Sequence, residues 1–419
     1  MSKRVHSLPA ALCRVATVAL LATATATFLA GCAKTAIKAD NKTGPPIDST
    51  TSPTTADTSI VISSYSPAKI RGGDTLKVYG KNFPTNTSSY SVTLNSKPLT
   101  VIASSPDSIG VIVPKMVGSG PVTLKVGSTA YAGPSVAYDY VVTVTTIAGT
   151  GQVGTNSGPA LSSSFNCPWG IVADANGDLY IADCYNRLIR QYSAATASVS
   201  TIAIPGTVSF YSPYNIALDR TTHNLYVTDF NIHLLKVNAN QNMTVIYNDS
   251  TPTAGIALGP DGNLYMANNT FGTIIRLDTN GNNRFLFASN INTPRNLIFD
   301  KSGNLYVGAD GIFEITPAGV MSEVTLDPGF GGWEIARDTL GNIYEADHFN
   351  NNLRIIEASS GNSIVIAGSG IADDIDGIGL NASFDGPQGL TIDDQGILYL
   401  TTYDYTTGGG NKIRKITVQ

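Results

Sequence analysis

The sequence predicts an all-β protein, and two patterns along the chain support this. Residues 60–142 alternate apolar and polar positions between turn residues, as in TLKVYG and PVTLKVG, which is typical of half-buried strands. Residues 143–419 repeat one frame: an aliphatic–Asp strand, a turn, a strand containing Leu-Tyr or Ile-Tyr, and a basic–aliphatic strand. The tyrosines of the six copies are Tyr180, Tyr226, Tyr265, Tyr306, Tyr344 and Tyr399. Repeats of roughly forty residues with several short strands each predict propeller blades, so six copies predict a six-bladed β-propeller.

The N-terminus predicts export and a lipid anchor. Basic residues precede an apolar run over residues 15–29, as in a secretory signal. Residues 29–32 read LAGC, which resembles the lipobox of bacterial lipoproteins; the alternative is an ordinary signal peptide with an incidental cysteine. The resemblance implies removal of residues 1–31 and lipidation of Cys32. Because Ala33 rather than aspartate follows, it also implies an outer-membrane lipoprotein of the bacterial cell envelope, facing either the periplasm or the outside.

The mature chain is expected to begin with a flexible tether. Residues 32–59 are rich in Thr, Ser and Pro and contain no aromatic residue, so they cannot bury enough apolar surface to fold. Removal of residues 1–31 lowers the formal net charge from -5 to -8. No basic run or stripe is present, which argues against nucleic acid as a partner. The membrane, reached through the lipid, is the first predicted partner.

Residues 60–142 resemble an IPT/TIG domain. The resemblance rests on Ser66-Pro67, Gly72-Gly73, Val113-Pro114 and SGPVTLKV at residues 119–126. It implies an immunoglobulin-like β-sandwich that acts as a spacer or packing partner.

Residues 143–419 resemble the NHL-repeat propellers, whose blades have four strands, a to d, from the channel outward. The last copy ends after its strand c. VTTIAG at residues 144–149 matches SIVIAG at residues 363–368, which ends the fifth copy. The first strand of the domain is therefore expected to complete the last blade and close the ring, leaving no free edge.

The residue after the proline that enters strand a suggests a ligand site at the channel mouth. Through the six blades this position holds Trp169, Tyr214, Ala254, Arg295, Trp333 and Gln388. Aromatic rings that lean toward solvent can stack on sugars, and Arg or amide groups can bind hydroxyls. The predicted ligand-binding residues are Trp169, Tyr214, Arg295, Trp333 and Gln388. The alternative is packing between blades.

A second aromatic set follows strand b on the same face, and for it we expect packing between blades rather than binding. Its members are Tyr185, Phe230, Phe271, Phe349 and Tyr403.

The next position along strand a suggests a metal. It holds Gly in three blades and Asn215, Asn296 and Glu334 in the others, and such oxygens could ligate Ca²⁺. Gluconolactonase-like propellers, which these residues resemble in this respect, hold a divalent metal in this general way. The alternative is hydrogen bonding between strands. An acidic loop at residues 373–376 is expected to be solvated rather than to bind calcium.

Cys167 and Cys184 are the only thiols left once the signal is removed and Cys32 is lipidated. In a hairpin that turns at Asn176-Gly177, they face each other near the strand ends, which predicts a disulfide in an oxidising compartment.

No catalytic residues are predicted. No histidine lies on a strand a, and no G-x-S-x-G motif occurs. The predicted function is therefore an envelope-anchored lipoprotein that binds a poly- or oligosaccharide at the propeller face. The alternatives are a protein–protein docking scaffold, or a metal-dependent lactonase- or hydrolase-like enzyme. No cofactor is predicted other than possible Ca²⁺.

Overall fold

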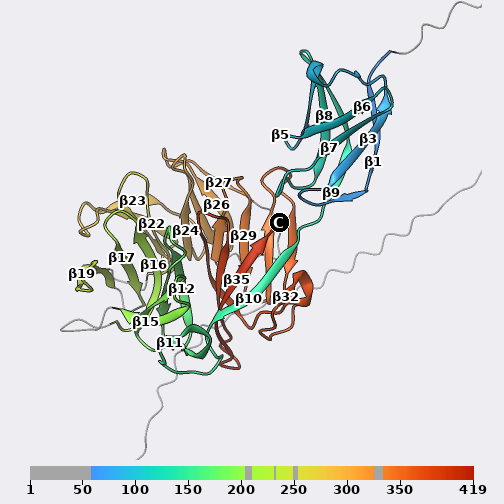
Figure 1. Ribbon diagram of the computed structural model, residues 1–419. Coiled ribbons are helices and arrows are strands. Elements are labelled where there is room, and N and C mark those ends of the chain that lie inside the picture. The colour runs from blue at the N-terminus through green and yellow to red at the C-terminus, as the bar shows by residue number, and fades with distance from the viewer. Residues whose placement is uncertain (1–57, 203–209, 231–232, 249–252, 325–333) are drawn as a thin grey trace, which may run out of the picture. The chain divides into compact units, whose positions relative to one another are not determined.

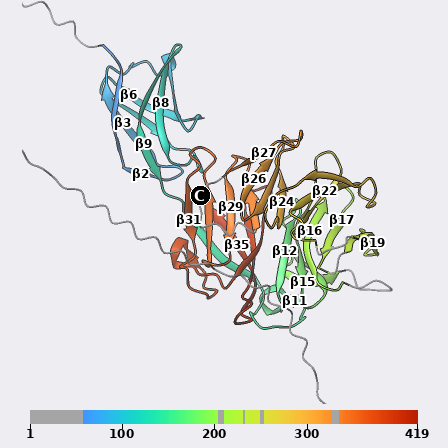
Figure 2. The same ribbon diagram turned by 180° about the vertical axis from the view of Figure 1, so that it is seen from behind.

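The computed structural model describes residues 58–202, 210–230, 233–248, 253–324 and 334–419, which form eight β-sheets (Figures 1 and 2). The predicted signal, Cys32, the predicted tether up to residue 57 and Trp333 lie outside these residues. Within the described residues, no helix is long and apolar enough to cross a membrane.

Residues 61–138 form the predicted β-sandwich. One sheet has the order β1-β3-β7-β6, and the other has the order β2-β9-β8-β4-β5. The strands are β1 (Val61–Ser66), β2 (Lys69–Ile70), β3 (Thr75–Lys81), β4 (Tyr90–Leu94), β5 (Lys97–Pro98), β6 (Thr100–Ser105), β7 (Ser108–Ile112), β8 (Gly120–Val126) and β9 (Thr129–Tyr138). A 3-10 turn, η1 (Thr87–Ser89), precedes β4. Alternate residues of β4 and β8 are buried, so each sheet turns one apolar face into the shared core.

Six further sheets form the blades of the propeller. Blade one contains β11 (Gly158–Pro159), β12 (Pro168–Ala173), β13 (Leu179–Asp183), β14 (Leu188–Ser193) and β15 (Ser198–Ile202). Blade two contains β16 (Pro213–Asp219), β17 (Asn224–Asp229), β18 (His233–Val237) and β19 (Met243–Asn248). Blade three contains β20 (Ile256–Leu258), β21 (Leu264–Asn268), β22 (Thr273–Leu277) and β23 (Phe285–Ala288).

Blade four contains β24 (Asn296–Phe299), β25 (Leu305–Ala309), β26 (Gly311–Ile315) and β27 (Met321–Glu323). Blade five contains β28 (Glu334–Arg337), β29 (Ile343–Asp347), β30 (Asn352–Ile356) and β31 (Ser363–Ala367). Blade six contains β10 (Val142–Ala148), β32 (Gly377–Ile378), β33 (Pro387–Ile392), β34 (Leu398–Tyr403) and β35 (Gly410–Val418). Short 3-10 turns, η2 (Ala160–Ser162) and η3 (Gly379–Asn381), precede β12 and β33. Apolar clusters fill the spaces between neighbouring blades.

The ring closes as predicted. The first propeller strand, β10, pairs antiparallel with β35 from Val142 opposite Val418 to Ala148 opposite Ile413. The two strands run side by side in both ribbon views (Figures 1 and 2). Each innermost strand a contacts the next one around the ring, including β12 with β33. The six-bladed all-β fold is therefore confirmed.

The recurring aspartate at the end of strand a stabilises the turn that follows it. In blade six, the Asp393 carboxylate accepts the backbone N–H groups of Gln395 and Ile397 at 2.9 Å each, and the hydroxyl of Tyr399 at 3.1 Å. Gly396 in this turn has a φ of +79°, which only glycine adopts without strain. Asp338 and Asp300 accept the same pair of backbone N–H groups in blades five and four. The repeated Asp and Tyr are thus explained by turn geometry, without a functional role.

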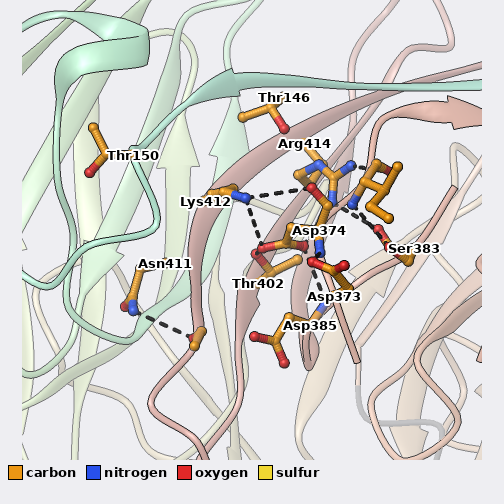
Figure 3. Close-up of polar contacts among 12 residues, drawn as sticks. Thr146, Thr150, Asp373, Asp374, Ser383, Asp385, Thr402, Asn411, Lys412 and Arg414 are labelled. Carbon is orange, nitrogen blue, oxygen red and sulfur yellow. Dashed lines mark hydrogen bonds and ion pairs between the residues drawn. The ribbon is translucent and has the colours of Figure 1, made fainter. Parts of the chain in front are cut away.

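A buried arginine anchors the loop that leads into blade six (Figure 3). Arg414 is fully buried and donates to Asp374 at 2.7 Å, to Asp376 at 3.0 Å and to the carbonyl of Ser383 at 3.0 Å. Lys412 lies 3.8 Å from the carboxylate of Asp374. The expectation of a solvated acidic loop is therefore wrong for Asp374, because its side chain is 3% exposed and pairs with two cations.

The loop into blade one repeats this arrangement. Arg190 is fully buried and donates to Asp183 at 3.0 Å and to the carbonyls of Ser164 at 3.0 Å and Asn156 at 2.8 Å. Each of the two arginines therefore ties a long loop to a strand c, and we name these contacts the arginine latches of Arg190 and Arg414.

Candidate functional site

The starts of strands a and the ends of strands b lie on one face of the propeller, as predicted. Pro168 at the start of β12 is opposite Asp183 at the end of β13, and Pro213 is opposite Asp229 in blade two. We call the face made by these strand starts and by the turns after strands b the mouth face.

The predicted aromatic platforms are recessed rather than exposed. Trp169 and Tyr214 are each 6% exposed, and their rings pack with centroids 4.4 Å apart. The centroid of the Tyr405 ring lies 5.5 Å from that of Trp169. The expectation that Trp169 and Tyr214 lean toward solvent is therefore wrong, since both rings pack against their neighbours.

The other predicted ligand residues have different positions. Gln388 is buried; its amide donates to the carbonyl of Tyr403 at 3.1 Å and lies 3.0 Å from Nδ1 of His348. Burial lowers the pKa of His348. Arg295 is half-buried and close to Tyr214; burial raises the pKa of the Tyr214 hydroxyl, and the charge of Arg295 opposes that rise. Trp333 lies outside the described residues.

The exposed rings belong instead to the set for which packing was expected. Tyr185 is 46% exposed, Phe230 40%, Phe271 60% and Phe349 65%, whereas Tyr403 is buried. Tyr405, which the sequence analysis did not single out, is 44% exposed. The packing expectation is therefore confirmed for Tyr403, and Tyr185 packs against it from the neighbouring blade, but four of the five rings also expose at least 40% of their surface.

We define the aromatic rim as the exposed rings that follow strand b in five blades: Tyr185, Phe230, Phe271, Phe349 and Tyr405. Recessed rings connect several of them. Tyr403 lies 5.8 Å from Tyr185 and 5.2 Å from Tyr405, and Tyr214 lies 5.9 Å from Phe230. The signal that could have identified the rim is an aromatic residue at a turn position in blade after blade.

A buried polar cluster lies beneath the recessed rings. Glu334 is 3% exposed and Asn296 is 6% exposed, and the Asn296 amide donates to Oε2 of Glu334 at 2.6 Å. The indole N–H of Trp169 faces the Glu334 carboxyl, although it forms no hydrogen bond of normal geometry. Burial raises the pKa of Glu334 to about 8, against the opposing effects of Trp169, Asn296 and Arg295. The carboxyl is therefore largely protonated at neutral pH.

The three predicted metal ligands offer few free oxygens. The Asn215 side-chain oxygen accepts the backbone N–H of Ile216 at 2.8 Å, so its unpartnered atom is the amide nitrogen. Only Oδ1 of Asn296 and Oε1 of Glu334 lack partners, and calcium takes six to eight oxygen ligands. In the described part of the chain, no group of three His, Cys, Asp or Glu side chains is placed to hold a metal. Calcium binding stays a prediction that this arrangement does not strengthen.

The two cysteines face each other as the hairpin predicts. The backbone N–H of Cys184 donates to the carbonyl of Cys167 at 3.2 Å, and both side chains are buried beside Trp169. Both are free thiols in the structure, so the predicted disulfide is not present in it. Burial raises the pKa of Cys167, whereas hydrogen bonds from Cys167 and Ser212 lower the pKa of Cys184. Cys184 is thus the thiol that ionises more readily.

Oxidation is expected to join the two sulfurs, because the side chains are already in contact. Oxidised glutathione would accept the two electrons and the two protons and be reduced to two molecules of glutathione. Mass spectrometry of protein that begins at residue 33 should find the loss of two hydrogen atoms and no alkylatable thiol. Cys167→Gly is the matched control: Cys167 has a φ of +58°, and blade six has Gly386 with a φ of +62° at the equivalent position. That variant should fold and keep one alkylatable thiol. Two reactive thiols in oxidised wild-type protein would contradict the prediction.

Comparison with known proteins gives matches for both domains. The model of the IPT/TIG domain matches residues 61–140, and the model of the NHL repeat matches residues 165–192, which span the first three strands of blade one. Protein SUPPRESSOR OF QUENCHING 1, chloroplastic, from Arabidopsis thaliana is 25% identical over 287 residues. That match covers 61% of this chain, and the chain spans only 26% of the relative.

Solved structures from Bacteroides share the fold over most of the chain. A structural genomics protein of unknown function from Bacteroides thetaiotaomicron has a TM-score of 0.58 at 21% identity, over 86% of this chain and 98% of its own. An auxiliary nutrient binding protein from the same organism has a TM-score of 0.54 at 17% identity, over 86% and 97%. One from Bacteroides ovatus has a TM-score of 0.53 at 18% identity, over 86% and 98%. At these identities the likeness shows the fold. The chain therefore contains an IPT/TIG domain at residues 61–140 and, within its six-bladed β-propeller, an NHL repeat at residues 165–192.

Proposed function

We propose that the protein is an envelope-anchored binding protein whose aromatic rim recognises a poly- or oligosaccharide. The observation that carries the proposal is the rim itself: five rings between 40% and 65% exposed, one from each of five blades, on one face of the propeller. Soluble proteins seldom leave several large aromatic rings exposed together unless they bind something. The fold shared with two auxiliary nutrient binding proteins supports a binding role.

Sugar is favoured over protein as the ligand because flat apolar faces of sugars stack on exposed aromatic rings. Asn186 and Asn350 follow two of the rim residues in the same turns, but their side-chain N–H groups donate to Gly154, Asp183 and Asp347. Only their side-chain oxygens could therefore accept from a sugar hydroxyl. Protein docking is the second candidate function. Three of the five rim rings are phenylalanines, which have no hydroxyl group to form a hydrogen bond with a sugar.

The test compares two phenylalanines of similar exposure. Phe271 in the rim is 60% exposed, and Phe285 on the outer strand β23 is 56% exposed. Phe271→Ala should weaken polysaccharide binding about two- to tenfold, the contribution of one stacked ring, whereas Phe285→Ala should leave it unchanged. Binding is measured by retardation in gels that contain each member of a polysaccharide panel.

Both variants should keep the melting temperature of the wild type, since each removes an exposed ring. If no polysaccharide retards the folded wild-type protein, or if the two variants lose affinity equally, the rim does not bind sugar.

The envelope location is proposed from residues 29–32, which lie outside the described residues. Cys32→Ser should release the protein from membranes or leave the signal uncleaved, because the acyl anchor requires that sulfur. Fractionation with a carbonate wash measures the change, and an unaltered membrane fraction would refute the lipid anchor.

A further inference from the structure

The channel of the propeller contains a cavity of about 320 Å³ that the aromatic rim does not line. Strands a of all six blades surround it. Apolar side chains such as Ile216, Leu297 and Leu390 form much of its wall. Asn215 and Asn296 line it near the starts of strands a, and Arg220 and Arg337 line it near their ends. Its volume falls within the lower range of small-molecule sites.

Unpartnered polar atoms gather at the end of the cavity near the mouth face. Nδ2 of Asn215 and Oδ1 of Asn296 have no hydrogen-bond partner, and both residues line the cavity at 5% and 6% exposure. Next to Asn296, the carboxyl of Glu334 and the indole N–H of Trp169 face each other, so Asn215 and Asn296 supply the open donor and the open acceptor of the cavity. Buried polar atoms normally have partners, because leaving one unpaired is unfavourable by about 1–3 kcal/mol. These two open atoms therefore call for a bound molecule that accepts from Asn215 and donates to Asn296.

The side chains that line the cavity determine which kind of molecule it would bind. The apolar wall favours an apolar body, and the polar end offers both hydrogen-bond donors and acceptors. A formal charge would be poorly solvated at the polar end, because the arginines that line the cavity, Arg220 and Arg337, lie at its other end and pair with Asp394 and Asp300. We propose that the channel is a second binding site, separate from the aromatic rim, for a small uncharged molecule with an apolar body and an amide-like head that both donates and accepts hydrogen bonds.

The test uses two rings of the same size. 2-Pyrrolidone has an N–H donor and a carbonyl acceptor, whereas cyclopentanone has only the carbonyl. Titration of the full chain carrying Trp333→Phe, followed by the fluorescence of Trp169, should saturate with both compounds. The lactam should bind roughly five- to tenfold more tightly, because one more hydrogen bond forms.

Variants locate the site. Asn215→Leu and Asn296→Leu should each weaken lactam binding at least fivefold, whereas the same change at the exposed turn residue Asn176 should have no effect. Phe271→Ala should also have no effect, which separates this site from the proposed sugar site. If a leucine variant fails to fold, Asn215→Ala and Asn296→Ala remove the same polar atoms without adding volume, and each should likewise weaken lactam binding at least fivefold.

Several results would overturn the proposal. No saturable change in Trp169 fluorescence means that the cavity holds only water. Equal affinity for the two compounds means that binding is not at the polar end of the channel. The same conclusion follows if Asn176→Leu weakens lactam binding as much as Asn215→Leu and Asn296→Leu do. Loss of lactam binding in Phe271→Ala places the binding on the aromatic rim instead.

Discussion

Trp169→Ala is expected to lower the free energy of unfolding by about 3–5 kcal/mol, the usual range for a buried tryptophan truncated to alanine. The ring is 6% exposed, packs against Tyr214 at 4.4 Å and Tyr405 at 5.5 Å, and shares a cluster with Cys167 and Cys184. Neighbours from three blades are too constrained to fill the space left behind. Urea unfolding followed by circular dichroism measures the loss without relying on the deleted fluorophore.

Phe271→Ala is the matched control for Trp169→Ala, because it also removes an aromatic ring from the mouth face but from an exposed position. Its free energy of unfolding should change by no more than about 0.5 kcal/mol. A loss below about 1 kcal/mol in Trp169→Ala would mean that Trp169 is not part of the core, and its role as an exposed sugar platform would have to be reconsidered.

Arg414→Met is expected to destabilise the protein by about 3–5 kcal/mol, because it breaks a buried ion pair by removing one partner. Asp374, whose side chain is 3% exposed, would keep its charge with only Lys412 3.8 Å away, and the carbonyls of Ser383 and Ile375 would lose their donors. The loop of residues 373–385 would then lose its attachment to β35 (Figure 3). The change is measured by the same urea unfolding.

An exposed ion pair in the sandwich provides the control for the Arg414 latch. Arg71 pairs with Asp139 at 2.6 Å, but their side chains are 57% and 40% exposed. Arg71→Met should therefore change stability by at most about 1 kcal/mol. Asp374→Asn in the Arg414→Met background should recover part of the loss, because it removes the buried charge. Equal effects of the two single arginine variants would show that Arg414 acts as a surface residue.

The sequence predicted the blades and their closure because both depend on local periodicity. Apolar alternation and the aspartate turn repeat along the chain, and residues 144–149 match residues 363–368, so the spacing of these features predicts the fold. The facing of Cys167 and Cys184 followed from hairpin register in the same way, and the hydrogen bond between their backbones confirms it.

The direction of the aromatic side chains could not be predicted in this way. The pairing of β12 with β13 shifts between Pro168 and Ile171, and that of β16 with β17 shifts between Pro213 and Asn215. Such a bulge changes the direction of the side chains around it. The alternation of buried and exposed side chains along strand a therefore does not extend to Trp169 or Tyr214. The aromatic residues after strand b recur in blade after blade, but turn positions do not determine whether a side chain packs or faces solvent, so their exposure became clear only from the structure.

The Arg414 latch could not be predicted from the sequence either. Asp374 and Arg414 are 40 positions apart. Asp374 lies in a loop, whereas Arg414 lies in a strand. Nothing local distinguishes a carboxylate that will neutralise a buried guanidinium from one that will remain in water. The sequence shows that the loops leading into blades one and six have equal length, but it does not show which arginine each loop binds.

The pairing of β10 with β35 ties folding to the order in which the chain is made. Strand β10 is the first of the propeller to be synthesised, and its full-length neighbour, residues 410–418, is the last of the described propeller strands. Until those residues are available, blade six has an open edge that can pair with other unfinished chains. For a chain that crosses a membrane unfolded, ring closure must then await the arrival of residues 410–418, and proteases and chaperones can compete for the chain in this interval.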